Sequence, residues 1–322
     1  MSSENAMSNP AESFEPYRRR LLGLAYRMLG SMADAEDAVQ ETYLRWHAVD
    51  HKRVMDPRAF LMTTTTRICL DMLTSARARH EEYVGPWLPE PVFDTAALAP
   101  DSRAELAEDL SIALLLILDR LSPLERAAFL LHDVFDFSFG AVATALNRSE
   151  AACRQLATRA RAHVRAERPR GATSPLPRSG EIDQKHAQLL SAFAAATQAG
   201  DLNRLMQMLA GDARVVTDGG GKVRAALNVI EGADRVAQFL VEVTRHRQRP
   251  DAWWRDDFRV RFAAVNGLPG VIVEGREGPV QTTAFEIEDG LIRALYVVRN
   301  PEKLRHLATT PRESDAERPS GS

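Results

Sequence analysis

Apolar residues recur at helical spacing over two long stretches of the chain, and a different pattern follows them. Residues 13–80 and 104–166 show this helical pattern, and no strand pattern competes with it. Between them, residues 81–103 hold four prolines and no clear period, which predicts an extended linker. Residues 167–182 are rich in Pro, Gly, Ser and Arg, which predicts a second linker.

The remainder of the chain combines both patterns. From residue 183, two short helices, a Gly-rich turn and a helix near 233–246 are expected. Alternating apolar and polar residues then predict strands near 257–264, 271–275, 280–288 and 291–299. Asn266-Gly267 and Asp289-Gly290 have the sequence of hairpin turns between such strands. The predicted fold is therefore multi-domain: two all-α modules, then an α+β module over 183–310, with polar, disordered tails at 1–12 and 311–322.

Composition narrows the class of protein. The 322 residues carry a formal net charge of −3, which excludes a uniformly basic protein but allows a basic patch on one module. The two cysteines, Cys69 and Cys153, lie far apart in predicted helices, which excludes a disulfide scaffold and a Cys-rich zinc site. No apolar run approaches the roughly 20 residues that span a bilayer, and the N-terminus lacks the layout of a secretory signal. We expect a cytoplasmic protein with no membrane contact and no cofactor.

An acidic stripe lies on a predicted helix of the first module. Ser31 and Asp34 form a capping-box-like start, and Asp34, Asp37 and Glu41 then share one face. The opposite, buried face is predicted to contain Ala35, Ala38, Val39, Thr42 and Trp46. Acidic residues near a helix N-terminus favour the helix dipole, and that alone could explain the stripe. The alternative is a docking surface for a basic partner.

The next helix begins at Asp56-Pro57, with the aspartate as N-cap and the proline in the first turn. Four successive threonines interrupt its apolar pattern. The buried stripe is predicted to contain Leu61, Thr64, Thr65, Ile68 and Met72. The helix ends in Arg77, Arg79 and His80, which suit either a helix C-terminus or contact with phosphates.

The second helical module has the layout of a helix-turn-helix. Ser122-Pro123-Leu124-Glu125 is a capping box, and a short helix near 138–146 closes at Asn147, which tolerates a left-handed backbone. Ser149 opens a last helix. Its buried face is predicted to contain Cys153, Leu156, Ala157, Ala160 and Val164.

A second face of that last helix is basic. It carries Arg154, Thr158, Arg161 and Arg165, with Gln155 and Arg159 beside it. A solvated basic helix normally mixes in acidic residues for pairing at i,i+4, and none occurs from Cys153 to Arg165. Because arginine forks match phosphates and guanine edges, DNA contact is the favoured interpretation.

These segments resemble a known family. FEPYRRRLLGLAYRMLGSMADAEDAVQETYLRWH and DPRAFLMTTTTRICLDMLTSARAR resemble sigma region 2 of bacterial extracytoplasmic-function (ECF) sigma factors of the sigma-70 class. LSPLERAAFLLHDVFDFSFGAVATALNRSEAACRQLATRARAHVR resembles sigma region 4. Three short motifs resemble those of the sigma J type, which carries a C-terminal SnoaL-like extension: WLPEP at 87–91, DGGGK at 218–222 and NPxKL at 300–304.

The resemblance implies specific roles for residues of the two helical modules. Region 2 would bind the β′ clamp helices of core RNA polymerase through Asp34, Asp37, Gln40 and Glu41. The loop near 48–55 and the following helix would open the −10 element, with Arg67, Arg77 and Arg79 on the DNA backbone. Region 4 would bind the β flap and the −35 element. Its DNA-contacting residues would be Arg148, Ser149, Arg154, Gln155, Arg159 and Arg161.

The resemblance also implies a role for the extension, a SnoaL/NTF2-like α+β fold. It would bind the linker and tune the spacing of the two sigma modules. The residues expected in this contact are Trp87, Leu88, Pro89, Glu90, Pro91, Asp218, Gly219, Gly220, Gly221, Lys222, Asn300, Pro301, Lys303 and Leu304. An alternative for the linker is a stiff spacer without regulatory contact.

Two other functions stay open from the sequence. One is a DNA-binding regulator fused to a SnoaL-like isomerase, cyclase or ligand-binding module, in which Asp218, His246, Trp253 and Trp254 would surround a pocket for a small molecule. The other is a plain helix-turn-helix regulator, which would have no use for the acidic stripe. A sigma factor that is monomeric away from polymerase, with no catalysis of its own, is the leading hypothesis.

Overall fold

The computed structural model describes residues 10–81, 83–93, 98, 110–167, 183–247 and 258–309, with only the backbone described at 52, 75–81 and 308–309. The C-terminal tail, most of the second linker and residues 104–109 therefore lie outside the described residues. The N-terminal tail was predicted to extend to residue 12, and this boundary is wrong because the first helix already begins at Pro10. Proline suits this place, since the first turn of a helix leaves its N–H groups unpaired.

The first module is a helical bundle. It contains α1 (Pro10–Leu29), α2 (Met32–His47), the short 3-10 turn η1 (His51–Arg53) and α3 (Pro57–Glu81). The predicted helix starts are confirmed: Ser31 Oγ accepts from the Asp34 N–H, and Asp56 Oδ1 accepts from the Ala59 N–H at 3.0 Å.

The threonines of α3 are buried in a different register from the one predicted. Thr65 and Thr66 are buried, whereas Thr64 is only half-buried. Each hydroxyl donates to the carbonyl four residues earlier, which satisfies it inside the bundle. The hydroxyls of Thr42 and Thr65 also meet at 2.9 Å, so these polar side chains join α2 to α3.

The second module contains α4 (Ile112–Arg120), α5 (Pro123–Phe129), a π-helical turn (Leu130–Val134), α6 (Phe139–Leu146) and α7 (Glu150–Glu167). The capping box of Ser122 and Glu125 is present, and Asn147 ends α6 in the left-handed conformation with φ 52°. The predicted helix-turn-helix of α6 and α7 is thus confirmed. The two helical modules share one apolar core, in which Leu24 of α1 packs in the same cluster as Phe129 of α5.

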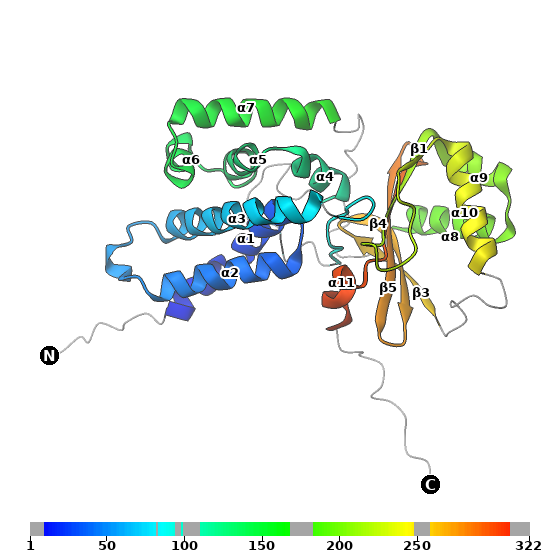
Figure 1. The fold of residues 1–322 in the computed structure, drawn as a ribbon, viewed down its shortest axis with the longest axis horizontal. Helices are drawn as coiled ribbons and strands as arrows, with labels where there is room; N and C mark the ends of the chain where they lie inside the picture. Colours follow the sequence, from blue (N-terminus) through cyan, green and yellow to red (C-terminus); the bar gives the residue numbers. More distant parts are fainter. Residues whose placement is uncertain are drawn as a thin grey trace, which may run out of the picture.

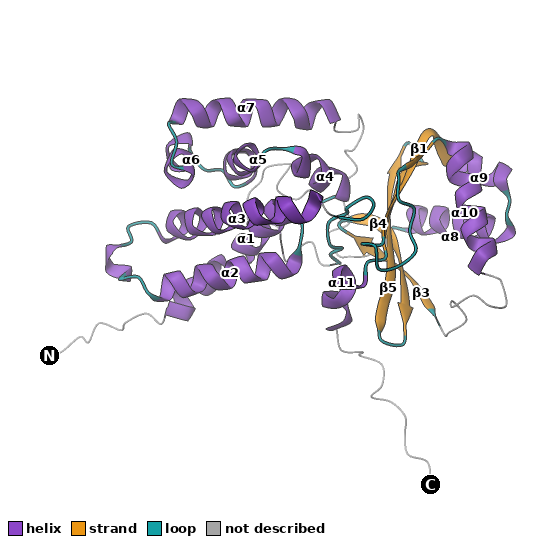
Figure 2. Cartoon of the chain, in the orientation of Figure 1, coloured by secondary structure: helices purple, strands orange, loops and turns teal. Residues whose placement is uncertain are grey.

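The C-terminal module contains a six-stranded sheet with its three longer helices on one face (Figure 2). Its elements are α8 (Gln184–Ala199), α9 (Leu202–Met208), β1 (Leu209–Asp218), β2 (Ile230–Glu231), α10 (Ala233–Arg247), β3 (Arg259–Val265), β4 (Leu268–Gly275), β5 (Gly278–Glu288), β6 (Leu291–Val298), α11 (Pro301–Leu304) and the 3-10 turn η5 (Arg305–Thr309). Among the described strands the order is β2-β1-β6-β5-β4-β3, and only β1 and β6 pair in parallel.

The predicted fold class is confirmed, but β1 and β2 were not predicted. Residues Gly211 and Asp212 interrupt the alternation of β1, whose second half is buried at nearly every position. Such a strand lacks the period that identifies a half-buried one.

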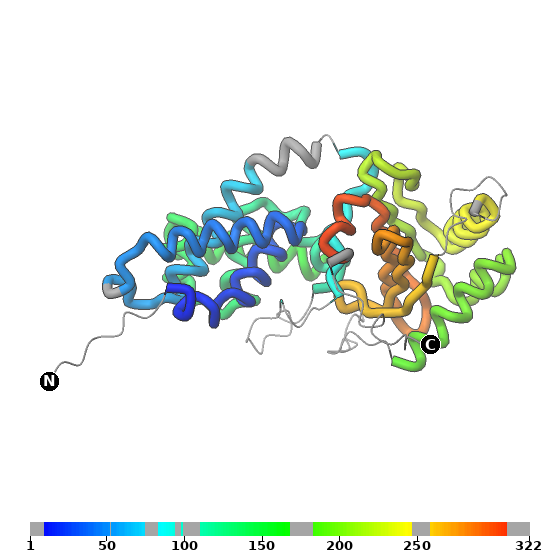
Figure 3. The backbone as a smooth tube through the Cα atoms, turned by 90° about the horizontal axis from the view of Figure 1, so that it is seen from below, coloured from blue at the N-terminus to red at the C-terminus, as the bar shows by residue number. Residues whose placement is uncertain are grey.

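Both faces of the sheet are covered, and the linker packs on one of them. Helices α8, α9 and α10 cover one face (Figure 1). The opposite face packs against the linker, α4 and α11, with Leu88, Ile112 and Leu304 in one apolar cluster with Tyr296 of β6. The helical modules form one half of the molecule and the C-terminal module the other, and the linker lies between them (Figure 3).

Candidate functional site

The carboxylate of Asp218, at the end of β1, is completely buried and binds the linker. Its Oδ1 accepts from the Tyr83 hydroxyl at 2.6 Å and from the Gly220 N–H at 3.0 Å. Its Oδ2 accepts from the Leu88 N–H at 2.8 Å and from Lys303 Nζ at 2.7 Å. A buried carboxylate is stable only when it is paired and hydrogen-bonded, and here both oxygens are.

Lys303 completes this site from α11. Its ammonium donates to Asp218 and to the Leu88 carbonyl, and it lies 4.3 Å from the ring centre of Trp87 and 4.8 Å from that of Tyr83. Aromatic faces attract a cation at such distances. Burial lowers the pKa of the Lys303 amine, and Asp218 opposes that shift. Burial, then the hydrogen bond to Asp218, raises the pKa of Tyr83.

We call this group the linker cluster; its members are Tyr83, Trp87, Leu88, Asp218, Asn300 and Lys303. Asn300 Nδ2 donates to the Tyr83 hydroxyl at 2.9 Å. The Gly-rich turn allows the approach: at Gly220, with φ +58°, an added Cβ would lie 2.3 Å from Asn300 Nδ2. At Gly221 it would lie 3.1 Å from the Val84 side chain. Lys222 pairs with Glu302 at the exposed rim.

The other side of the linker binds the first helical module. The Glu90 N–H donates to the Gly30 carbonyl at 2.8 Å, and Glu90 Oε2 accepts from the Met32 N–H at 2.7 Å. The Tyr26 hydroxyl donates to the Glu90 carbonyl at 2.6 Å and accepts from Asn266 Nδ2 at 2.7 Å. Asn266 belongs to the β3–β4 turn, so one buried network joins α1, the linker and the sheet.

Two aromatic rings close the contact. Trp87 packs on Gly30, where an added Cβ would lie 2.4 Å from the indole. Nε2 of His306, in η5, lies 2.8 Å from the Pro91 carbonyl oxygen, and Nδ1 of the same ring lies 3.7 Å from Glu90 Oε2. The linker is therefore held from both sides over its WLPEP residues.

The structure brings together nearly all residues expected in the interdomain contact. Of these, Pro301 is exposed at the start of α11 and Lys222 is at the rim. Sequence reasoning missed Tyr26, Gly30, Tyr83, Asn266 and His306. Asn266 was visible as half of an Asn-Gly turn, and its φ of +51° fits that prediction, but the turn gave no sign of a partner 240 residues away.

Arginines join the two helical modules to each other. Arg67 of α3 donates from Nε to the Ala145 carbonyl at 3.0 Å and from Nη2 to the Thr144 carbonyl at 2.7 Å, at the end of α6. Arg58 donates to the Phe135 carbonyl at 2.7 Å.

Arg126 of α5 makes a third contact of this kind. It is buried, donates to the Met28 carbonyl at 2.5 Å and pairs with Asp119 at 3.0 Å. Burial lowers the pKa of Arg126, and Asp119 opposes that shift. We call the contacts of Arg58, Arg67 and Arg126 the module interface.

The acidic stripe of α2, which also includes Gln40, is open. Asp37 and Gln40 are exposed, Asp34 and Glu41 are half-buried, and Glu41 pairs with Arg45 at 3.0 Å. In Figure 1, α2 lies on the side of the helical body away from α5, α6 and α7. Of the other region 2 residues, Arg67 is in the module interface, and the side chains of Arg77 and Arg79 lie outside the described residues.

The buried face of α7 is confirmed in full, but its basic face is not free of acids. Arg154 pairs with Glu150 at 2.8 Å, Arg159 with Glu125 at 2.6 Å and Arg161 with Asp133 at 2.7 Å. The premise that these arginines lack acidic partners was wrong, because the partners come from the first turn of α7 and from neighbouring elements. Arg148, Ser149, Gln155, Thr158 and Arg165 are exposed.

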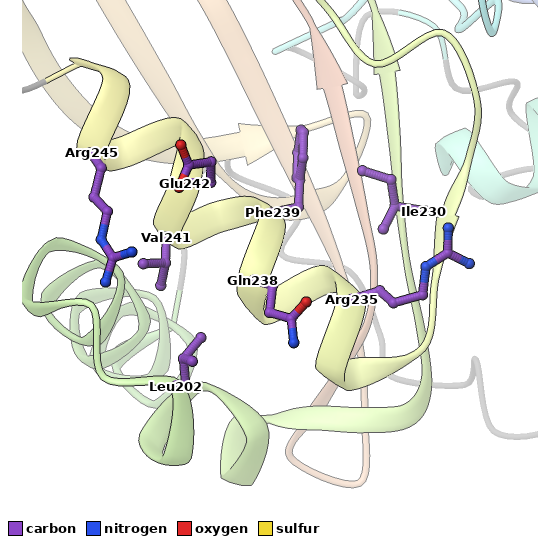
Figure 4. A pocket seen from close by; sticks show the side chains of 8 residues that line it. All are labelled: Leu202, Ile230, Arg235, Gln238, Phe239, Val241, Glu242 and Arg245. Carbon is purple, nitrogen blue, oxygen red and sulfur yellow. The ribbon is translucent and has the colours of Figure 1, made fainter.

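The hollow of the C-terminal module differs from the predicted pocket. A groove of about 550 Å³ lies between α9, α10 and β2, lined by Leu202, Ile230, Arg235, Gln238, Phe239, Val241, Glu242 and Arg245 (Figure 4). Asp218 is in the linker cluster instead, and His246 pairs with Glu242 on α10. Trp253 and Trp254 lie outside the described residues. Asp218 and His246, which the alternative function places around one pocket, therefore belong to different sites.

Within the described part of the chain, no three His, Cys, Asp or Glu side chains converge in a way that could hold a metal ion. None of the described helices combines the length and apolar character needed to cross a bilayer.

Two family models match the chain at its helical modules. The model described as Sigma-70 region 2 matches residues 14–79, and the one described as Sigma-70, region 4 matches residues 111–164. Both ranges fall on the segments whose residues resemble these regions.

Relatives match over almost the whole length. The ECF RNA polymerase sigma factor SigJ of Mycobacterium tuberculosis is 39% identical over 299 residues, which cover 90% of this chain and 91% of the relative. The probable ECF RNA polymerase sigma factor SigI of the same organism is 31% identical over 296 residues, 91% of this chain and 93% of the relative. The crystal structure of M. tuberculosis SigJ superposes with a TM-score of 0.67 at 34% identity, covering 91% of this chain and 97% of that chain.

Proposed function

The chain belongs to the ECF RNA polymerase sigma factors, and we propose that it selects promoters for core polymerase under the control of its own C-terminal module. The linker cluster carries the second part of this proposal. One Pro-rich segment that connects the two sigma modules is bound by region 2 on one side and by the C-terminal sheet on the other. The site of action would be the cytoplasm, where the polymerase is.

Polymerase docking is assigned to the acidic stripe. Asp34, Asp37, Gln40 and Glu41 present carboxylates and an amide on one face of α2, suited to a basic surface such as that expected of the β′ clamp helices. Region 4 would bind the β flap. Because Asp37 and Gln40 of the stripe are exposed, the described conformation leaves this docking surface available.

Promoter reading is assigned to two separate surfaces. At the start of α7, the DNA-contacting residues for the −35 element would be Arg148, Ser149, Arg154 and Gln155. Further along the helix, Arg159 and Arg161 would exchange their acidic partners for phosphates. Arg67, Arg77 and Arg79 of α3 would bind the backbone of the opened −10 element.

The described conformation is too compact to read both elements together. Elements at −35 and −10 lie about 25 base pairs apart, or about 85 Å at about 3.4 Å per base pair. Helix α3, the longest in the helical half, has 25 residues and is about 37 Å long at 1.5 Å per residue. Since Arg67 of region 2 touches α6 of region 4 directly, the modules must separate to occupy a promoter. We assign the compact conformation to the free protein.

The C-terminal module would control this separation through the linker. Residues 83–93 can extend between separated modules only if they leave Asp218 and Lys303. The module would thus take the place of a separate inhibitory protein, and release of the linker cluster would permit the promoter-bound conformation.

Run-off transcription with purified core polymerase tests the proposal. The full chain, on promoter fragments that include its own upstream region, is compared with the double variant Asp37→Arg and Glu41→Arg. Glu12→Arg is the matched control, because Glu12 is exposed on α1, on a different helix from the acidic stripe. We expect transcripts from the wild-type and control chains and none from the double variant. Transcripts that survive the double variant, or tight duplex binding without any transcript, would reject the proposal.

A further inference from the structure

Arg67 stands out among the residues of the module interface because both of its hydrogen bonds go to the end of one helix. Its fork binds two carbonyls, of Thr144 and Ala145, in the last turn of α6. The carbonyls of a helix C-terminus have no partner within the helix and carry a partial negative charge of about −0.5. Arg67 is exposed at the edge of the interface, so another ligand can reach it once α6 moves away.

The same chemistry recognises a phosphodiester. A guanidinium that offers two parallel donors to paired carbonyl oxygens can offer them to two phosphate oxygens, which carry a full charge. Helix α3 follows the η1 loop, at the end of region 2 that is assigned to the −10 element. One guanidinium cannot serve the end of α6 and a phosphate at the same time.

We propose that Arg67 is a shared contact: in the free protein it holds region 4 on region 2, and after separation the same fork binds the backbone of the melted −10 strand. This proposal rests on the function proposed above. It makes closure of the molecule and DNA binding by α3 mutually exclusive, with nucleic-acid phosphate as the ligand that competes with α6.

Arg126 is the control residue in the same interface, because it can hold the two modules together but cannot bind DNA from α3. Arg126 belongs to α5 and bonds the Met28 carbonyl, so it closes the same two modules without lying on α3. Its partner Asp119 is partly exposed, with 30% of its side-chain surface accessible, and can be solvated when Arg126 is replaced. Arg126→Gln therefore opens the interface and leaves the Arg67 guanidinium on α3 unchanged.

The test uses two separate measurements on the full chain. Module separation in the free protein is read by energy transfer between dyes placed through Glu36→Cys on α2 and Ala166→Cys near the end of α7, two exposed positions. The native Cys69 and Cys153 are buried. DNA binding is read with the reconstituted holoenzyme on fork-junction DNA whose −10 strand is single-stranded, over a range of salt concentrations. The reference chain for this measurement is Arg126→Gln, whose module interface is already open, so adding Arg67→Ala to it reports the DNA role alone.

We expect Arg67→Ala to lower energy transfer in the free protein to the level of Arg126→Gln. In the holoenzyme, Arg67→Ala added to Arg126→Gln should weaken fork binding about tenfold and reduce the magnitude of the salt slope by about 0.7, the value for one phosphate contact on a single strand. Arg126→Gln alone should leave the salt slope at the wild-type level and should not weaken fork binding. Arg67→Lys, which keeps a charge but loses the fork, should open the free protein and retain most of the salt slope.

Two results would overturn the proposal. If the double variant had the fork affinity and salt slope of Arg126→Gln alone, Arg67 would be limited to the module interface, and unchanged energy transfer in Arg67→Ala would remove its closing role. A wild-type holoenzyme that binds no promoter DNA is a different outcome. It would reject the proposed function and the DNA role together, while the energy-transfer measurement would still test closure. Far-ultraviolet circular dichroism of each variant identifies any loss of fold.

Discussion

Lys303 donates a hydrogen bond to Asp218 at 2.7 Å and so joins α11 to the end of β1, 85 residues earlier in the chain. Both side chains are buried, with 9% and 0% of their surfaces exposed. Their polar atoms bind the backbone N–H and carbonyl of Leu88 in the linker. The ion pair thus binds the segment between the sigma modules to the C-terminal sheet.

Lys303→Met should weaken the binding of the linker to the C-terminal sheet. The substitution keeps much of the apolar stem but leaves the Asp218 carboxylate buried without its cation, which typically costs about 3–5 kcal/mol. We expect a lower free energy of unfolding for the C-terminal module and faster proteolysis of the linker. Chemical denaturation and limited proteolysis of the full chain measure both.

Lys222→Met is the matched control for that variant. Its partner Glu302 is also on α11, but both side chains are about half exposed, and such pairs contribute little. Equal losses in the two lysine variants would contradict the assignment of linker binding to the buried pair.

Gly220→Ala should disrupt the same site by a steric route. Gly220 has φ +58°, and an added methyl would lie 2.3 Å from Asn300 Nδ2. A left-handed backbone costs a non-glycine residue about 1–2 kcal/mol, and displacing Asn300 brings the total to about 3 kcal/mol or more.

Gly290→Ala separates these two costs. Gly290 has φ +78° with nothing within 4 Å of an added Cβ, so only the backbone cost applies. Denaturant midpoints of the two variants should differ accordingly. If Gly290→Ala lost as much stability as Gly220→Ala, the close approach of the linker would have no energetic role.

The local parts of this fold were predictable, because their signals lie within a few residues of each other. Ser122 and Glu125 form the capping box that their spacing predicts, and Asn147 adopts the left-handed conformation that closes α6. The three motifs around Trp87, Asp218 and Lys303 also meet in one place, as the resemblance implies. The capping box and the Asn147 cap depend on residue type and short spacing, which a sequence displays directly, whereas the meeting of the three motifs was implied by the resemblance alone.

The features that were missed depend on contacts across the chain. Arg58, Arg67 and Arg126 bind backbone carbonyls, and a carbonyl acceptor leaves no mark on the residue type that carries it. The acids that pair with the α7 arginines lie up to 34 residues away, outside the run from Cys153 to Arg165. Strand β1 lost its period because the sheet is covered on both faces. Tertiary packing decides such features.

Glu125 should give the helix-turn-helix module an acid-sensitive component of stability. Its carboxylate accepts from the Ser122 hydroxyl and N–H and pairs with Arg159, and these contacts lower its pKa from the ordinary value of 4.5. Because the folded pKa lies below the unfolded one, the contribution is complete above about 4.5 and is lost as pH falls through the folded value.

Glu125→Gln tests this pH dependence. At neutral pH we expect a loss of about 1 kcal/mol, which is typical of a weakened helix cap. The difference from the wild type should shrink on acidification below about pH 4.5, as measured by urea denaturation at a series of pH values. A difference that stays constant across this range would show that the carboxylate charge has no part in the cap.

The open acidic stripe leads to a prediction about how the C-terminal module acts. If the module inhibited by covering the polymerase-binding surface, breaking the linker cluster would raise the affinity for core polymerase. Asp37 and Gln40 are already exposed in the compact conformation, so we expect Lys303→Met to change core affinity by less than about threefold. The same variant should instead increase promoter binding by the assembled holoenzyme, because separation of the sigma modules no longer requires rupture of the buried pair. Fluorescence anisotropy with labelled protein measures the first quantity, and fork-junction DNA binding measures the second. A large gain in core affinity with unchanged promoter binding would place the control at polymerase docking, whereas the expected result places it at the linker, after docking.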